Sequence, residues 1–308
     1  MNRRTWIGGA SVAGLAAAGT ALYRVSPWFW HRYVEEMKRP IEPAARRPRP
    51  ETWPDQGLYG AWLGHSTVLL KIDGVTVITD PALGEKIGPS AGPLVIGLKR
   101  LRAPALAVRE LPKVDVILLS HAHFDHFDLP TLRKLESKAT TVITAPKTSD
   151  LLRIDRYGSV REVGWGERTR AGPLEVRGLE VNHWGARIRR DTWRGYGGYL
   201  LECGRYRVLF GGDTAWTTSF ASLRGARSVD LALMPIGAYN PWIRAHCTPE
   251  QAWKMGEHAR ADRFVPIHHQ TFDLSSEPVL EPIGRFREAA GREAGRIIAA
   301  SAGDEFRV

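Results

Sequence analysis

Two short runs rich in β-branched and apolar residues predict a hairpin near the start of the folded region. They cover residues 67–72 and 75–80 and are separated only by Asp73-Gly74. This dipeptide is typical of two-residue hairpin turns, because both positions accept the positive φ angles that such turns require. We therefore expect two antiparallel strands joined by a tight turn.

Farther along the chain, apolar runs alternate with signals for helices. Residues 114–120 are almost continuously apolar, which suits a buried strand. Helices are expected to begin near Leu129-Pro130 and at Thr248, where Gln251 completes a capping-box pattern. Further strands are expected at residues 141–145, 199–203, 206–210, 231–234 and 264–267, the second and third forming another hairpin. Hairpins followed by alternating strands and helices predict a layered α/β fold with mixed sheets.

Residues that can bind metal ions stand just beyond the ends of four expected strands. They are Asp80, His121, Asp213 and His268. Ligands of open α/β sheets gather beyond the carboxyl ends of the strands. This placement therefore predicts a functional site at one edge of the sheets.

The densest group of such residues lies in residues 118–128, LLSHAHFDHFD. His121 and His123 are two positions apart, so their side chains point to the same side of an extended backbone. A turn after them would bring Asp125 and His126 alongside. Mixed nitrogen and oxygen ligands suit zinc, with manganese or iron as alternatives. Four ligands exceed the three of an open zinc site, and predict two ions about 3.5–4 Å apart that share a hydroxide.

The composition, 43% hydrophobic and 25% charged residues, is ordinary for a globular protein. The net charge of +10 suggests nucleic-acid binding, but residues 1–50 hold nine basic and three acidic residues, and so +6 of the total. Attraction of this segment to anionic lipid explains the charge better, so the expected partner is a membrane surface rather than a nucleic acid. Cys203 and Cys247 are expected to be buried thiols, with one disulfide left open as the alternative.

The N-terminus carries a candidate targeting segment in residues 1–25. Arg3-Arg4 precede an Ala- and Gly-rich apolar stretch, which resembles a twin-arginine export signal. If it is not cleaved, the stretch is long enough to anchor the chain in a bilayer. Residues 26–54, rich in Pro and Arg, are expected to form a linker before a domain of residues 55–308. The expected location is across or on the bacterial inner membrane, with the domain on the periplasmic side.

The pattern His-x-His-x-Asp-His after an apolar strand resembles the signature of the metallo-β-lactamase superfamily. The downstream segments VNHW, FGGDT and PIHHQTF match the later metal-site motifs of that superfamily in order, and ITDP matches the first. The resemblance implies a four-layer αββα sandwich, in which helices flank two mixed β-sheets.

The same resemblance implies a role for each motif residue. Seven residues would hold two zinc ions: His121, His123 and His183 one ion, Asp125, His126 and His268 the other, with Asp213 bridging. Asp80 would support the site from outside the ligand set. His269 adjoins His268; the alignment of IHHQTF favours His268 as the ligand and leaves His269, like Asp80, to support the site from outside the ligand set.

Other segments narrow the resemblance to one branch of the superfamily. GHSTVLLKIDGVTVITDP, GLKRLRAP and HCTPEQA, spread over residues 64–272, look like the branch that contains N-acyl-phosphatidylethanolamine-hydrolysing phospholipase D. This implies a phosphodiesterase acting on that lipid or a related phospholipid. The alternative is a metal-dependent lactonase or ester hydrolase. A non-catalytic metal-binding envelope protein is a third reading, which the intact ligand set disfavours, and the export-like segment disfavours nucleic-acid hydrolysis.

Several further residues have two open interpretations. Asp125 is expected to orient the nucleophile or relay a proton, and His246 to protonate the leaving group. His65 could orient a ligand, line the substrate cleft or be purely structural, and the same three roles are the alternatives for His246. Six tryptophans could line a lipid-facing groove, although any single one is more often a core residue: Trp62, Trp165, Trp184, Trp193, Trp216 and Trp242.

Overall fold

The computed structural model describes residues 34–91, 94–188, 190–225 and 227–308. The described residues 34–40 and 41–308 belong to two separate units, and residues 34–38 are helical. The candidate signal or anchor at residues 1–25 lies outside the described residues and stays a prediction. In the described ranges, no helix combines the length and the apolar character needed to cross a membrane.

The first of two large sheets has seven strands in the order β10-β9-β8-β3-β2-β1-β17. β3, β8, β9 and β10 are paired in parallel, whereas the β3-β2-β1-β17 half is antiparallel. Its strands are β1 (Leu58–Gly64), β2 (Thr67–Ile72), β3 (Val75–Thr79), β8 (Val116–Leu119), β9 (Thr141–Thr144), β10 (Ser159–Glu162) and β17 (Glu305–Arg307).

The second sheet has six strands in the order β11-β12-β13-β14-β15-β16. β11 to β14 pair antiparallel, and β14, β15 and β16 pair in parallel. Its strands are β11 (Arg168–Ala171), β12 (Leu174–Leu179), β13 (Gly198–Cys203), β14 (Tyr206–Phe210), β15 (Val229–Pro235) and β16 (Ala261–Ile267). Both sheets are therefore mixed, as predicted.

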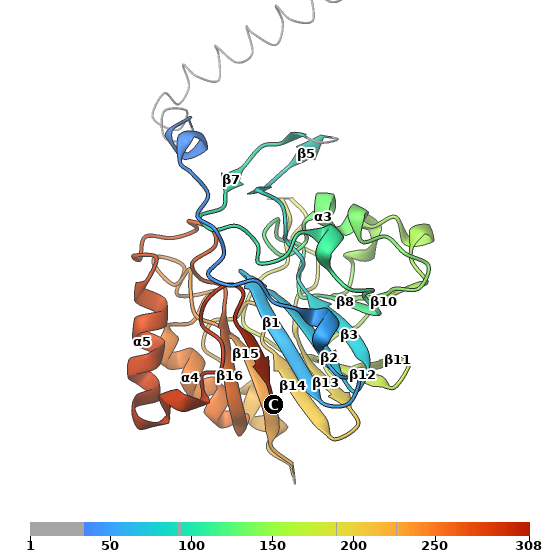
Figure 1. Cartoon of the computed structure of the whole chain (residues 1–308), viewed down its shortest axis with the longest axis vertical. Coiled ribbons are helices and arrows are strands. Elements are labelled where there is room, and N and C mark those ends of the chain that lie inside the picture. The colour runs from blue at the N-terminus through green and yellow to red at the C-terminus, as the bar shows by residue number, and fades with distance from the viewer. Residues whose placement is uncertain (1–33, 92–93, 189, 226) are drawn as a thin grey trace, which may run out of the picture. The chain divides into compact units, whose positions relative to one another are not determined.

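The two sheets pack face to face around a shared core (Figure 1). Val77 and Leu118 from the first sheet meet Leu201 and Phe210 from the second in this layer. α4 (Pro249–His258) and α5 (Glu281–Ala290) cover the outer face of the second sheet. α3 (Leu129–Lys134) and irregular segments cover the outer face of the first. The predicted four-layer arrangement is confirmed, with fewer helical residues on the α3 side.

The local predictions for hairpins and caps are confirmed. Asp73 and Gly74 turn between β2 and β3 with φ angles of 45° and 85°. β13 and β14 form the second predicted hairpin. At the start of α4, Thr248 and Gln251 form the predicted capping box.

The two cysteines are free and buried in different layers. Cys203 lies in the core between the sheets, and Cys247 lies between the second sheet and its helices. The prediction of two buried thiols is confirmed, and the disulfide left open from the sequence is not formed.

The described part of the expected linker differs from the prediction. Residues 41–54 belong to the same compact unit as the domain. Trp53 is buried, and its indole N–H donates to Glu305 at 2.8 Å. The backbone N–H of Arg46 donates to Ala302 at 3.2 Å. The prolines that suggested a free linker therefore belong to a segment that packs along the C-terminal strand.

A narrow arm of four short strands extends away from the sheets (Figure 1). β4 (Lys86–Ile87) pairs with β7 (Leu98–Lys99), and β5 (Ser90–Ala91) pairs with β6 (Leu94–Val95). The base of the arm packs on the loop after β16 through apolar contacts among Ile87, Leu98, Phe272 and Leu274.

Candidate metal centre

Seven loops converge at one edge of the sandwich, and each follows the carboxyl end of a strand. β1 and β3 run in the same direction because both pair antiparallel with β2, and β3 is parallel to β8. β12 and β14 likewise share a direction with β15 and β16. The loops contribute His65 after β1, Asp80 after β3, His121–His126 after β8, His183 after β12, Asp213 after β14, His246 after β15 and His268 after β16.

One half of the site is a cluster of three imidazoles, which we call the histidine triad: His121, His123 and His183. Their ligand nitrogens face one another, with His121 Nε2 2.8 Å and His183 Nε2 3.4 Å from His123 Nδ1. The carbonyl of Ala245 accepts from His183 Nδ1 at 2.8 Å, so this nitrogen carries the proton and Nε2 is left with its lone pair. The triad therefore directs three nitrogen atoms that could bind a metal ion towards one point.

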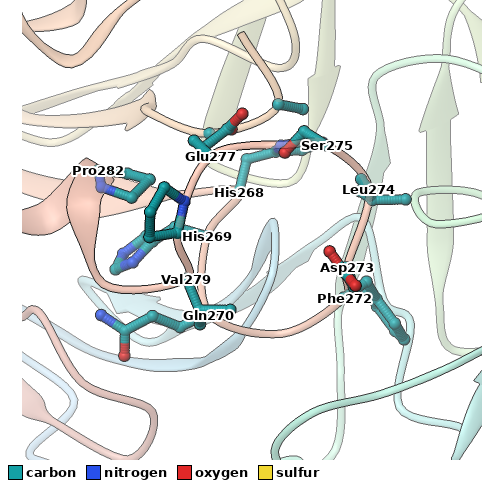
Figure 2. A pocket seen from close by; sticks show the side chains of 13 residues that line it. His268, His269, Gln270, Phe272, Asp273, Leu274, Ser275, Glu277, Val279 and Pro282 are labelled. Atoms are coloured by element: carbon teal, nitrogen blue, oxygen red, sulfur yellow. The ribbon is translucent and has the colours of Figure 1, made fainter. Parts of the chain in front are cut away.

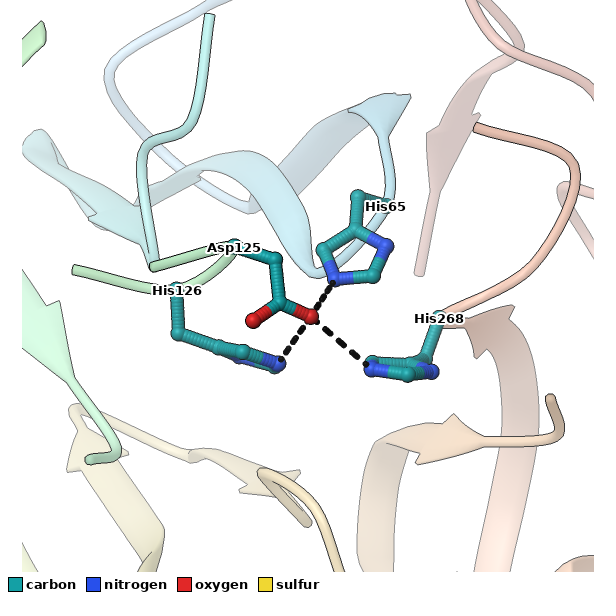
Figure 3. A group of neighbouring side chains, drawn as sticks. All are labelled: His65, Asp125, His126 and His268. Atoms are coloured by element: carbon teal, nitrogen blue, oxygen red, sulfur yellow. Dashed lines mark hydrogen bonds and ion pairs between the residues drawn. The ribbon is translucent and has the colours of Figure 1, made fainter. Parts of the chain in front are cut away.

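The other half, which we call the mixed cluster, contains Asp125, His126 and His268. Figure 3 shows His126, His268 and the neighbouring His65 all directed at the same carboxylate oxygen, Asp125 Oδ2. Their Nε2 atoms lie 3.4, 3.5 and 3.0 Å from that oxygen, respectively. The sequence places these four residues on three distant loops, and the fold brings their ligand atoms within 4.8 Å of one another.

Asp213 stands between the two halves. Its Oδ2 lies 3.1 Å from Nε2 of both His126 and His268 in the mixed cluster. The same oxygen lies 4.0 Å from His121 Nε2 and 3.8 Å from His183 Nε2 in the triad. One carboxylate oxygen thus faces nitrogens of both halves, the position that a bridging ligand requires.

Asp80 holds one histidine of each half from behind. Its Oδ2 lies 2.6 Å from His126 Nδ1 and accepts from the hydroxyl of Ser120 at 2.5 Å. The same hydroxyl oxygen lies 2.9 Å from His121 Nδ1. Burial raises the pKa of Asp80, and the contacts with His126 and Ser120 oppose that rise. Orientation of ligand histidines by a carboxylate behind them is common in metal sites.

Burial and charge push the histidine pKa values apart. Burial lowers the pKa of His121, His123 and His183, and neighbouring histidines lower it further, so the triad rings are neutral. In the mixed cluster burial acts in the same direction, but Asp213 and Asp125 outweigh it. They raise the pKa of His268 to about 9 and that of His126 well above its usual value.

The two carboxylates shift in the opposite sense. Burial alone would raise the pKa of Asp125 and Asp213, but His126 and His268 beside them hold both pKa values well below the usual range. Both carboxylates are therefore ionised in a site from which water is largely excluded. Such charges need cations close by.

The residues present fit divalent metal ions. His126 Nε2, His268 Nε2 and Asp213 Oδ1 are buried and have no hydrogen-bond partner in the structure. Unpaired buried donors and acceptors are costly, so their convergence here needs an explanation. The neutral triad imidazoles and the ionised carboxylates are in the protonation states that bind metals, and His126 and His268 would release a proton on binding.

A cavity of about 200 Å³ opens over the cluster. His246 lines it, with Nδ1 buried, 3.8 Å from Asp213 Oδ2 and without a hydrogen-bond partner. Burial lowers the pKa of His246 to about 4. Trp184 and Trp242 also line the cavity and are 44% and 51% exposed, so the way in is apolar.

A smaller cavity of about 30 Å³ lies under the loop that follows β16 and shares His268 with the first (Figure 2). His269 lines it and does not face the metal-binding residues. Its ring stacks on Trp62 with centroids 4.4 Å apart, and its Nε2 lies 3.2 Å from the carbonyl of Pro266. Burial lowers its pKa to about 3. Of the two adjacent histidines, the structure therefore directs His268 into the cluster.

Two features of the site differ from the sequence analysis. The expectation that any single tryptophan is a core residue is wrong for four of the six: Trp165, Trp184, Trp193 and Trp242 are exposed, and only Trp62 is fully buried. Arg187 was missed. It donates to the carbonyls of Ala122 and Phe127 at 2.9 and 2.8 Å and so fixes the loop that carries the histidines.

Comparisons with known proteins agree with the fold and the site. Residues 76–269 match the model of the beta-lactamase superfamily domain. An uncharacterised protein of Mycobacterium tuberculosis is 32% identical over 242 residues, a match covering 76% of this chain and 64% of that protein. The chain thus spans less than two thirds of the length of this relative.

Two further likenesses concern proteins named as hydrolases. An N-acyl-phosphatidylethanolamine-hydrolyzing phospholipase D of Caenorhabditis elegans is 28% identical over 252 residues, covering 76% of this chain and 70% of the relative. The structure of a metallo hydrolase from Ignicoccus hospitalis superposes with a TM-score of 0.60 at 18% identity, covering 82% of this chain and all of that one. The chain belongs to the metallo-β-lactamase superfamily of metal-dependent hydrolases, and its relatives include N-acyl-phosphatidylethanolamine-hydrolysing phospholipases D.

Proposed function

We propose that this protein is a dinuclear metal-dependent phosphodiesterase of phospholipase D type, acting on N-acyl-phosphatidylethanolamine or a related phospholipid. The observation that carries the proposal is the position of Asp213 Oδ2, which faces nitrogens of the triad and of the mixed cluster beneath an open cavity. The similarity to the nematode N-acyl-phosphatidylethanolamine-hydrolyzing phospholipase D supports the choice of substrate.

The donor set indicates where two metal ions would bind. His121, His123 and His183 would hold one ion, Asp125, His126 and His268 the other, with Asp213 between them. Nitrogen and oxygen donors suit zinc, and manganese or iron also fit them. Two bound divalent ions would acidify a water molecule to hydroxide and neutralise the charge that develops on the phosphoryl group.

The protein's own residues then contribute orientation and proton transfer. Asp125 lies at the cavity and is ionised, so it can accept a hydrogen bond from the attacking water and align it. His246 lines the same cavity, so its imidazole can pass a proton to the departing alcohol oxygen. Its lowered pKa keeps the ring neutral in the free protein. A neutral ring can take up the proton released when the water becomes hydroxide and pass it to the departing alkoxide.

The cavity is large enough for the phosphodiester group of a phospholipid but not for its acyl chains. A volume of about 200 Å³ takes a phosphodiester group and little more. The apolar chains must therefore lie outside it, against exposed side chains such as Trp184 and Trp242. This supports a membrane surface as the place where substrate is met, with the N-terminal segment as the proposed export signal or anchor.

The direct test uses the full chain loaded with zinc. It is incubated with mixed micelles of N-acyl-phosphatidylethanolamine and, separately, with a panel of lactones and carboxylic esters. We expect release of phosphatidate and N-acylethanolamine, detected by mass spectrometry, and no release by an Asp213→Asn control. Lactone or ester turnover without phosphatidate would replace this function with that of the alternative hydrolase.

A further inference from the structure

His65 lies in the site although it belongs to none of the motifs that point to the metals. It follows β1 directly and adopts a left-handed backbone with φ of 53°, which is uncommon for residues other than glycine. Such conformations cost free energy and persist where the surroundings enforce them, often at functional sites. Asp80 and His268, two other residues of the site, also have positive φ angles, of 33° and 61°.

The backbone of His65 is held by three hydrogen bonds. Its N–H donates to Thr271 Oγ1 at 2.6 Å, and its carbonyl accepts from the Trp62 indole N–H at 2.7 Å. The same carbonyl accepts from the backbone N–H of His268 at 3.0 Å. None of these bonds uses the imidazole, so the fold does not need the ring in order to set the loop.

The imidazole makes its polar contact with the mixed cluster. Its Nε2 lies 3.0 Å from Asp125 Oδ2, and its ring centroid lies 4.2 Å from that of His268 (Figure 3). The ring is 1% exposed, so water does not compete for this hydrogen bond. Because a carboxylate oxygen only accepts here, His65 Nε2 carries the proton and donates it.

We propose that His65 is a positioning residue, which holds the Asp125 carboxylate in the orientation that binds the second metal ion. The inference rests on the proposed dinuclear function. Asp125 Oδ2 also faces His126 Nε2 and His268 Nε2, the two nitrogens without hydrogen-bond partners. A carboxylate has several lone-pair sites, so a hydrogen bond to one of them leaves the others for a cation. His65 differs from the ligands because its inward nitrogen is already occupied by that bond.

The geometry excludes two simpler roles. A ligand role would require His65 Nε2 to be free, whereas it makes a hydrogen bond of 3.0 Å to Asp125 Oδ2; the Nε2 atoms of His126 and His268 have no hydrogen-bond partner. A purely structural role would place the important contacts on the scaffold, whereas the ring contacts Asp125, His126, His268 and Phe272, three of which line or form the site.

The test compares two substitutions at this position in the full-length protein. His65→Asn tolerates the positive φ angle but is too short for its amide to replace Nε2. His65→Gln places an amide N–H near the position of Nε2. His258→Asn is the matched control, since His258 lies at the C-terminal end of α4 and contacts Trp216. Zinc stoichiometry is measured by plasma mass spectrometry and affinity by chelator competition, with cobalt absorption spectra reporting on coordination.

We expect wild type and His258→Asn to bind two zinc ions. His65→Asn should bind the first ion normally and the second about 10–100-fold more weakly, the usual effect of losing a residue that orients a ligand. His65→Gln should recover most of that affinity and the wild-type cobalt spectrum. In an Asp125→Ala background, His65→Asn should have no further effect on zinc affinity, because His65 acts through Asp125.

Unchanged affinity for the second ion in His65→Asn, or a loss in His65→Gln as large as that in His65→Asn, would overturn the positioning role while leaving the dinuclear function intact. A wild-type protein that binds fewer than two ions would instead overturn the dinuclear function, and the inference with it. If His65→Asn lacks a native circular-dichroism spectrum, His65→Gln decides alone. If His65 acts through its hydrogen bond, His65→Gln should keep its affinity for the second zinc ion. If His65 is a ligand or a packing residue, His65→Gln should lose that affinity.

Discussion

The histidine triad and the mixed cluster hold their metal-binding side chains in position in different ways. The triad consists of neutral rings fixed from behind, His183 by the carbonyl of Ala245 and His121 by the hydroxyl of Ser120. The mixed cluster is organised from within by charge, because Asp125 and Asp213 keep His126 and His268 protonated. The surrounding scaffold therefore orients the rings of the triad. In the mixed cluster, the rings are oriented by ion pairs that a bound metal ion would replace.

This difference predicts which substitutions should weaken metal binding in each half. The triad depends on contacts outside the cluster, so substitutions behind its rings should weaken it. The mixed cluster depends on the carboxylates themselves, so substitutions that alter their charge or orientation should weaken it most. Asp213 and Asp80 contact both halves, and substitutions there test whether the two halves act as one site.

Asp213→Ala should have the largest effect, because Asp213 Oδ2 lies within 4.0 Å of histidine nitrogens in both halves. Loss of the bridging carboxylate should remove several kcal/mol of transition-state stabilisation, a rate loss of roughly 10³-fold or more. Hydrolysis and bound zinc are measured together. Asp213→Asn, which keeps the shape and removes the charge, should be nearly as inactive, with a native circular-dichroism spectrum.

Hydrolysis at the wild-type rate by Asp213→Ala would contradict the whole site assignment. Retention of one zinc ion with complete loss of hydrolysis would instead separate the halves. It would indicate that the triad, in which His183 is held by a backbone carbonyl and His121 by the Ser120 hydroxyl, binds its ion without the bridge.

His246→Asn should have the next largest effect, and it should act on chemistry rather than on metal content. His246 lines the cavity, and a positioned general acid contributes about 10²–10⁴-fold to rate. We expect kcat to fall by that order with two zinc ions retained and KM changed little. A loss of zinc equal to the loss of rate would make His246 a ligand and add it to the triad side through Asp213 and His183.

Asp80→Ala should weaken both halves by a smaller amount. Asp80 contacts His126 directly and reaches His121 through Ser120, so its loss frees one ring in each half. Metal affinity should fall about 10–100-fold at both sites. Ser120→Ala sharpens the comparison, because it removes the contact to His121 and one hydrogen bond to Asp80 but leaves the direct contact between Asp80 and His126. Chelator competition should then show a weaker triad ion and an unchanged mixed-cluster ion, and equal weakening of both would contradict the division into halves.

Sequence reasoning reached the ligands because they occupy motifs after strands whose apolar pattern is strong. It reached the hairpin at Asp73-Gly74 for the same local reason. It left the role of His65 open between orienting a ligand, lining the cleft and a structural part, and it did not single out Arg187, because the partners of both residues lie 60 or more residues away in the chain. It also took residues 41–54 for a linker, because proline content is local whereas the burial of Trp53 depends on the distant C-terminal strand.

Glu162, outside both halves, should give the smallest effect and no change in metal binding. Its carboxylate accepts from the backbone N–H groups of Lys147, Thr148 and Ser149 at 2.8, 3.1 and 2.9 Å. Partial burial would raise its pKa, but these bonds outweigh burial and lower it. Its contribution to stability is therefore present above the unfolded-state pKa of about 4.3 and is lost as pH falls through the lower folded-state value.

Glu162→Gln should accordingly destabilise the fold by about 1 kcal/mol at pH 7, the size typical of a capping side chain. The difference from wild type should shrink as the pH is lowered below about 4, where the wild-type carboxylate becomes protonated. Urea unfolding midpoints at a series of pH values measure this, with zinc content as the control. A stability difference independent of pH would mean that the shape of the side chain, rather than its charge, holds this loop. A loss of zinc would mean that metal binding by the triad depends on Glu162 at the end of β10 as well as on the contacts directly behind its rings.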